Sequence, residues 1–212
     1  MANYDEEMTV SQSGEKTERA RKNILLLGDS IRQGYCAYAK AALSEVADVR
    51  YPNENCRFTQ HTLTSLPNYV RLFENCADID CVLFNNGHWD IAHWGGEEVS
   101  LNPIPVYTAM LGRIAAKLRK LAPNAKLYFA TTSPSNPNGT LGLNPRTNAE
   151  IEAYNAAAKE LMRSLNIPVC DHYGFLQPYS ADYYRDYCHL TEQGFRLLGE
   201  YTAQWLRKEM EF

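Results

Sequence analysis

The chain has 212 residues, a length that suits one domain with a sizeable core and is short for two. Hydrophobic residues make up 45% and charged residues 22%, as in ordinary globular proteins. The formal net charge is −4 and no basic stripe occurs, so nothing indicates a nucleic-acid-binding protein. No apolar run approaches the length of a membrane span, and residues 1–22 lack the apolar centre of a secretory signal. We therefore expect a cytoplasmic protein with no membrane partner and, since its six cysteines form no C-x-x-C pair, with free thiols.

Taken in chain order, residues 1–22 are predicted to form a flexible arm ahead of a single domain over residues 23–212. Short apolar runs predict strands at residues 24–27, 47–51, 81–85, 126–131 and 167–170. Helical periodicity fills the intervals: one helix follows Pro105, a second follows the capping-box pair Thr147 and Glu150, and Thr191 can cap the last. This alternation predicts a parallel sheet covered on both faces, with ligands bound beyond the carboxyl ends of the strands.

Ser30 directly follows the first predicted strand, in the sequence Gly28-Asp29-Ser30-Ile31. Gly28 lets the chain turn sharply, and a serine between a strand and a helix exposes its hydroxyl beside backbone N–H groups that can hold an oxyanion. Such a serine suits nucleophilic catalysis if a base reaches it. Two alternatives stay open: Ser30 only caps the helix, or the turn binds a phosphate, although the glycine spacing of a dinucleotide or Walker loop is absent.

A candidate base stands just before the last predicted helix, where the sequence reads Asp186-Tyr187-Cys188-His189. Histidine can take a proton from serine near neutral pH. A carboxylate three residues earlier can curl back to the other ring nitrogen and fix the tautomer. Taken alone, this pattern is equally compatible with a surface turn that contains an incidental histidine.

A Gly-Asp-Ser after the first strand and an Asp-x-x-His before the last helix are the opening and closing signatures of the SGNH (GDSL-like) hydrolases. The chain resembles that family over residues 23–212. The resemblance implies a three-layer α/β/α, flavodoxin-like fold with a central five-stranded parallel sheet. It implies Ser30 as nucleophile, His189 as general base and Asp186 as the residue that orients His189. It also implies ester hydrolysis without a metal ion or an organic cofactor.

The chain departs from the family pattern after the third strand. The family reads Gly-x-Asn-Asp there and uses the Asn side chain in its oxyanion hole, whereas residues 85–90 read Asn-Asn-Gly-His-Trp-Asp and place Trp89 at the Asn position. Either Asn85 or Asn86 can supply the missing amide. A divergent branch of the family with an Asn-x-Gly-x-(Trp/His)-Asp pattern favours Asn85. The alternative is that these asparagines only make turns.

The glycine that the family places after the second strand is also absent, and Asn55 or the N–H of Cys56 can replace it as an oxyanion donor. The aromatic segment 88–96, which contains Trp89, is expected to form part of the wall of the substrate pocket. Its tryptophans are compatible with stacking on a sugar ring, although tryptophans packed in a core are commoner than tryptophans in sugar-binding sites. Its two histidines are five residues apart and no cysteine is spaced for zinc, so no metal site is expected.

The sequence thus predicts a serine esterase that cleaves a short acyl group, such as an O-acetyl group on a carbohydrate, from a small-molecule ester. The chain is too short for a large lipid-binding insertion, which favours small acyl groups. One alternative is a catalytically impaired domain of the same fold that binds a carbohydrate or a partner protein. Another is a different α/β enzyme that handles phosphate at the first turn. Nothing in the sequence indicates an oligomeric state.

Overall fold

A central parallel sheet organises the computed structural model, which describes residues 21–139, 142–179 and 181–212. Its five strands have the order β2-β1-β3-β4-β5. They are β1 (Lys22–Leu27), β2 (Ala47–Arg50), β3 (Cys81–Phe84), β4 (Lys126–Ala130) and β5 (Val169–Cys170). The five predicted strands are confirmed, with small differences at their ends. The predicted arm lies almost wholly outside the described residues, and Lys22, its last member, opens β1.

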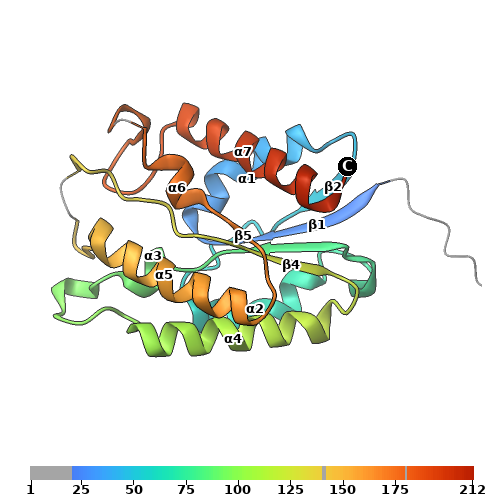
Figure 1. Cartoon of the computed structure of the whole chain (residues 1–212), viewed down its shortest axis with the longest axis horizontal. Coiled ribbons are helices and arrows are strands. Elements are labelled where there is room, and N and C mark those ends of the chain that lie inside the picture. Colours follow the sequence, from blue (N-terminus) through green and yellow to red (C-terminus); the bar gives the residue numbers. More distant parts are fainter. Residues whose placement is uncertain (1–20, 140–141, 180) are drawn as a thin grey trace, which may run out of the picture.

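Helices cover both faces of the sheet and complete three layers (Figure 1). On one face lie α1 (Ser30–Ala42), α6 (His172–Leu176) and α7 (Glu192–Met210). On the other lie α2 (Thr59–Val70), α4 (Ile104–Leu121) and α5 (Asn148–Ser164). Short helices follow β3, namely α3 (His88–Ile91) and the 3₁₀ turn η2 (Trp94–Gly96); the other 3₁₀ turns are η1 (Cys76–Asp78) and η3 (Ala181–Tyr183). Of the helices that the structure describes, none combines the length and apolar character needed to cross a bilayer.

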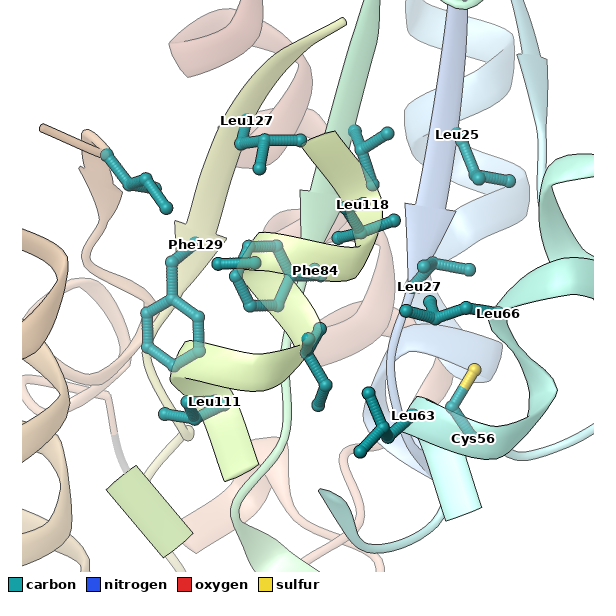
Figure 2. Packing of buried hydrophobic residues seen from close by; sticks show 14 of the residues in the cluster. Leu25, Leu27, Cys56, Leu63, Leu66, Phe84, Leu111, Leu118, Leu127 and Phe129 are labelled. Carbon is teal, nitrogen blue, oxygen red and sulfur yellow. The ribbon is translucent and has the colours of Figure 1, made fainter. Parts of the chain in front are cut away.

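Each central strand is buried on both faces because its apolar side chains alternate between two cores. In β1, Leu25 and Leu27 pack toward α2 and α4, while Ile24 and Leu26 pack toward α1 and α7. Figure 2 shows part of the first of these cores, in which Leu25 and Leu27 of β1 lie on the same side of the sheet as Phe84 of β3 and Phe129 of β4. This two-sided burial explains why the strands read as continuous apolar runs.

The predicted helix starts are also confirmed, because local capping signals set them. Thr147 and Glu150 form a reciprocal capping box at the start of α5. The Thr191 hydroxyl accepts a hydrogen bond from the Gly194 N–H at the start of α7. Pro105 lies in the first turn of α4, where its missing N–H costs nothing.

The helices α1 and α7 pack closely because glycines allow it. A Cβ atom on Gly199 of α7 would lie 2.8 Å from the carbonyl oxygen of Tyr35 in α1, and a Cβ on Gly34 would lie 2.2 Å from the Phe195 ring. Ser30 opens α1, and His189 precedes α7 by a few residues. The two residues thus lie at or just before the starts of two helices that pack together.

The order of the strands also places the candidate site. The chain leaves β1 toward β2 on one side, and β3 lies on the other side of β1. Ligands in open α/β sheets bind at such a switch point, beyond the carboxyl ends of the strands. The segments that follow β1 and β3, which carry Ser30 and residues 85–90, meet at this point.

Candidate active site

Ser30 is the first residue of α1, and Asp29 is the residue that caps the helix. The Oδ1 atom of Asp29 accepts a hydrogen bond of 2.9 Å from the N–H of Ile31. The alternative that Ser30 caps the helix is therefore wrong. Among the described residues, no acceptor contacts the backbone N–H of Ser30, as expected in the first turn of a helix. This N–H remains available to a ligand.

Ser30, His189 and Asp186 form one hydrogen-bonded chain. The Nε2 atom of His189 lies 2.8 Å from the Ser30 hydroxyl oxygen, and its Nδ1 lies 2.8 Å from Oδ2 of Asp186. Because the ionised carboxylate can only accept, Nδ1 carries the proton and Nε2 is free to accept the hydroxyl proton. This is the tautomer that a general base for Ser30 requires.

A tight turn holds Asp186 beneath His189. The carbonyl oxygen of His189 accepts from the Arg185 N–H, and an antiparallel bridge joins Tyr184 to Leu190. Within the turn, Oδ1 of Asp186 accepts from the backbone N–H groups of Cys188 and His189. Burial tends to raise the pKa of Asp186, but these N–H bonds and the imidazole hold that pKa below its ordinary value. The carboxylate thus stays ionised beside His189.

The loop after β2 is fastened to the start of α1. Arg32 donates to the carbonyl oxygens of Pro52 and Glu54, and the N–H of Cys56 donates to the carbonyl oxygen of Gly28. The Cys56 N–H is therefore already engaged. Asn55 lies between these anchors; its Oδ1 accepts from the Arg57 N–H, and among the described residues its Nδ2 has no acceptor. Of the two predicted donors in this loop, Asn55 is the one left available.

The asparagines after β3 are held more firmly. The Nδ2 of Asn85 donates to the carbonyl oxygen of Ala130, which leaves one N–H of this amide without an acceptor among the described residues. The Nδ2 of Asn86 donates both to the Arg57 carbonyl and to the Thr62 hydroxyl, so it has no N–H to spare. Asn86 therefore serves the structure of this loop.

A pocket of about 240 Å³ opens at Ser30. It is lined by Ser30, Asn55, Trp89, Trp94, Asn144, Arg146, Tyr187 and His189. The rings of Trp89 and Trp94 lie against each other, with centroids 4.9 Å apart. The structure thus brings four predicted residues together in one pocket wall (Ser30, Asn55, Trp89 and His189). Asp186 supports His189 from behind, and Asn85 does not line the pocket.

The sequence prediction missed three residues of the pocket lining, Asn144, Tyr187 and Arg146, of which Arg146 carries a charge. Arg146 is held by its neighbours. Its Nε–H donates to Nδ1 of His88, whose Nε2 in turn lies 3.1 Å from the Ser133 hydroxyl. Burial, together with the Arg146 charge, lowers the pKa of His88 well below its ordinary value, so His88 is neutral. Arg146 lies just ahead of the capping box that opens α5, and that local signal marks a helix start and not a functional residue.

Few described residues can hold a metal ion. The side chains of Asp186, Cys188 and His189 offer ligand atoms within 4.8 Å of one another. Burial raises the pKa of the Cys188 thiol to about 11, so it is a poor source of the thiolate that metals bind. The two histidines of the aromatic segment have different partners: His88 contacts Arg146, whereas His93 pairs with Glu150 at 2.6 Å.

Comparison with known proteins identifies the fold and the family. The profile of the GDSL-like Lipase/Acylhydrolase family matches residues 26–197. No match was found among curated proteins.

Among solved structures, an acetyl xylan esterase (AlAXEase) is similar with a TM-score of 0.69 and 16% identity, over 87% of this chain and 99% of that one. The lipase/acylhydrolase from Enterococcus faecalis has a TM-score of 0.70 and 19% identity, over 89% of this chain and 96% of that one. A carbohydrate acetylesterase family member from Sinorhizobium meliloti has a TM-score of 0.70 and 16% identity, over 91% and 100%. At these identities the likeness shows the fold, while the family match covers most of the chain. The chain therefore belongs to the GDSL-like lipase and acylhydrolase family and is an ester-hydrolysing enzyme.

Proposed function

We propose that this enzyme cleaves its ester through an acyl intermediate on Ser30. His189 takes the proton of the Ser30 hydroxyl while the serine oxygen attacks the ester carbonyl, and Asp186 stabilises the imidazolium that forms. His189 then returns the proton to the leaving alcohol. A water molecule, deprotonated by His189 in turn, releases the acid and restores Ser30. The observation that carries this proposal is the chain of 2.8 Å contacts from Ser30 through His189 to Asp186.

The developing oxyanion needs donors that are already in place. The Ser30 N–H at the start of α1 is one. For the second, the sequence favours Asn85, while the arrangement of the pocket favours Asn55, because Asn55 lines the pocket and its amide has no described acceptor. We propose that the Ser30 N–H and Asn55 hold the oxyanion, with the remaining N–H of Asn85 as the alternative.

The proposed substrate is a short-chain ester of a carbohydrate. A pocket of about 240 Å³ has room for a small acyl group with part of a sugar ring. The tilted pair of Trp89 and Trp94 offers aromatic faces of the kind on which sugar rings pack. Two of the similar structures are an acetyl xylan esterase and a carbohydrate acetylesterase, which agrees with this choice. The cytoplasmic location stays a prediction from the sequence.

The test is the Ser30→Ala variant assayed on 4-nitrophenyl acetate. We expect kcat to fall by about three orders of magnitude or more, because no other group can take the acyl. A serine-reactive phosphonate should add once to the wild type, at Ser30, and not to the variant, as read by intact-mass and peptide mass spectrometry.

Ser133→Ala is a matched control, since Ser133 also contacts a histidine. Arg146 donates to Nδ1 of His88, so His88 presents Nε2–H to the Ser133 hydroxyl and cannot accept its proton. The Ser133 variant should keep most of the activity. Undiminished activity in a folded Ser30→Ala protein would refute the proposed nucleophile.

A second candidate function is binding without turnover, favoured by the engagement of the Asn85 amide with Ala130. Such a domain would bind an acetylated sugar and not hydrolyse it. Isothermal titration of wild type and Ser30→Ala with the same acetylated sugar separates the two cases. Heat of binding without acetate release by the wild type would favour the binding module. Turnover of 4-nitrophenyl phosphate in place of the acetate would favour the phosphate alternative.

A further inference from the structure

Arg146 is a buried cation in the wall of the Ser30 pocket. Only 6% of its surface is exposed. It forms no ion pair with a carboxylate of residues 21–139, 142–179 or 181–212. Burying a charge is costly unless an opposite charge or a full set of hydrogen bonds compensates it. The Tyr187 ring, whose centroid lies 4.9 Å from the guanidinium carbon, offsets part of this cost. The hydrogen bonds of Arg146 show how much of its capacity remains.

The hydrogen bonds of Arg146 do not use its full capacity. A guanidinium has five N–H groups. Its Nε–H donates to Nδ1 of His88, Nη1 donates to the carbonyl oxygen of Asn144 at 3.3 Å, and Nη2 donates to Sγ of Cys188 at 3.2 Å. The last of these acceptors is a neutral and weak one. Each terminal nitrogen thus keeps one N–H without an acceptor in the described part of the chain.

The nearby carboxylates of Asp186 and Asp29 form no ion pair with Arg146. Asp186 is bonded to His189, and Oδ1 of Asp29 caps the N–H of Ile31. Burial raises the pKa of Asp29 and the Arg146 charge opposes this rise, but no ion pair joins the two groups among the described residues. Neither carboxylate therefore satisfies the free N–H pair of Arg146.

The rest of the pocket wall also suits an acceptor-rich ligand. No acidic residue is among the described residues that line it, and the side chains of Asn55 and Asn144 bring further amides. The rings of Trp89 and Trp94 belong to the same lining. A planar fork of N–H groups matches a carboxylate in geometry as well as in charge.

We propose that Arg146 binds the carboxylate of an O-acylated acidic sugar, a uronic-acid type residue whose ring packs against the tryptophan pair. The reaction is the ester cleavage proposed above: the acyl group passes to Ser30, and the sugar hydroxyl leaves with the proton that His189 returns. The inference rests on that proposed function and adds the charge of the preferred substrate. It makes Arg146 a residue that determines specificity.

The wild-type enzyme tests this without any substitution. Methyl glucuronide, monoacetylated on one ring hydroxyl, is compared with the same compound in which the carboxylate has become a carboxamide. We expect kcat/KM for acetate release to be about tenfold or more higher for the carboxylate, the advantage expected of one charge-assisted pair. Equal values would overturn the proposal. If neither compound is hydrolysed but 4-nitrophenyl acetate is, the proposal likewise fails while the esterase function stands.

Variants then assign the preference to Arg146. In Arg146→Gln the ratio of the two kcat/KM values should fall to about one, whatever happens to the absolute rates. Arg146→Lys should keep part of the ratio, because it retains the charge and loses the fork. Arg57→Gln is the matched control: its guanidinium lies 6.0 Å from the Trp89 ring centroid, it does not line the pocket, and it should leave the ratio unchanged.

Binding provides a readout that is independent of turnover. Isothermal titration of Ser30→Ala with both acetylated compounds should show tighter binding of the carboxylate, and the difference should vanish in Ser30→Ala/Arg146→Gln. An undiminished carboxylate preference in the double variant would mean that another group recognises the anion, and the proposal would be wrong. An equal loss on both compounds would assign Arg146 a purely structural role, through His88 and Cys188.

Discussion

At the scale of single residues, Asn55 and Asn85 are the two candidates for the second donor of the proposed oxyanion hole. Asn55 lines the pocket beside Ser30, and its Oδ1 is tied by the Arg57 N–H, which orients the amide. One N–H of the Asn85 amide already donates to the Ala130 carbonyl oxygen. An amide that is oriented in advance and has no other acceptor is the better donor for charge that develops only in the transition state.

We expect Asn55→Ala to lower kcat on 4-nitrophenyl acetate by about a hundredfold, with little change in KM. Asn85→Ala removes a hydrogen bond between the ends of β3 and β4, so its main effect should be on thermal stability, by about 1 kcal/mol or more. Steady-state kinetics and calorimetry on both variants decide between them. The reverse pattern, a large kcat loss in a folded Asn85 variant with Asn55→Ala unaffected, would make Asn85 the donor through its second N–H.

At the scale of elements, we expect the packing of α1 on α7 to set the distance between Ser30 and His189, the proposed nucleophile and base. A Cβ on Gly199 would lie 2.8 Å from the Tyr35 carbonyl oxygen and 3.0 Å from the Ala39 N. Since these are backbone atoms, the helices themselves must move apart to accept it. Gly199→Ala should therefore destabilise the protein by about 1–3 kcal/mol and also lower kcat more than it changes KM.

The control for this prediction is another helical glycine, Gly112 of α4, where a new Cβ would meet nothing within 4 Å. Gly112→Ala should raise stability by up to about 1 kcal/mol through helix propensity and leave the kinetics alone. Thermal unfolding and steady-state assays on the pair measure both effects. A Gly199→Ala enzyme with unchanged Tm and kcat would show that the contact of α1 with α7 does not control the alignment of Ser30 and His189.

The elements that the sequence predicted correctly are those with local signals. Apolar runs marked the five strands, and the caps at Thr147 and Thr191 marked helix starts. The hydrogen-bonded contacts among Ser30, His189 and Asp186 follow from two short motifs placed at element ends. Such signals depend only on residues that are close in the sequence, so they can be recognised without knowledge of the tertiary structure.

The features that the sequence did not predict depend on contacts between distant segments. Arg146 lies in the pocket wall through its contact with His88, 58 residues away in the chain. The engagement of the Asn85 amide likewise requires the Ala130 carbonyl of a neighbouring strand. No periodicity or cap signals such meetings, because both partners look like ordinary loop or strand-end residues in isolation.

At the scale of the whole molecule, a buried histidine couples folding to pH. His172 opens α6 and is 2% exposed; its Nε2–H donates to the Thr202 hydroxyl, which itself donates to the Leu198 carbonyl. Burial lowers the pKa of His172 to about 4, with Asp171 acting weakly in the opposite direction. In the unfolded chain a histidine takes up a proton near pH 6.5. The folded state therefore resists a proton that the unfolded state accepts between about pH 6.5 and 4.

This difference gives the sign of the pH dependence. The contribution of neutral His172 to stability is complete above pH 6.5 and is lost as the pH falls toward 4, by about 3 kcal/mol over the interval. Burial raises the pKa of Asp90 to about 6, and this carboxyl acts in the opposite sense, because the folded state holds its proton first. In the wild type, the change in unfolding free energy with falling pH thus contains two effects of opposite sign that partly cancel. Only a comparison of variants isolates the part due to His172.

We expect His172→Gln, whose amide can still donate to Thr202, to reduce the fall in unfolding free energy from pH 6.5 to 4 by about 3 kcal/mol. The measurement is urea unfolding at pH 7, 6, 5 and 4.

His93→Gln provides a control of opposite sign. Its hydrogen bond with Glu150 raises the pKa of His93, so the stability from that pair is present at low pH and is lost as the pH rises through the raised pKa. Removing it should steepen the acid loss. Parallel curves for wild type and His172→Gln would mean that His172 takes up its proton in the folded protein, and that the contact of α6 with α7 opens to admit it.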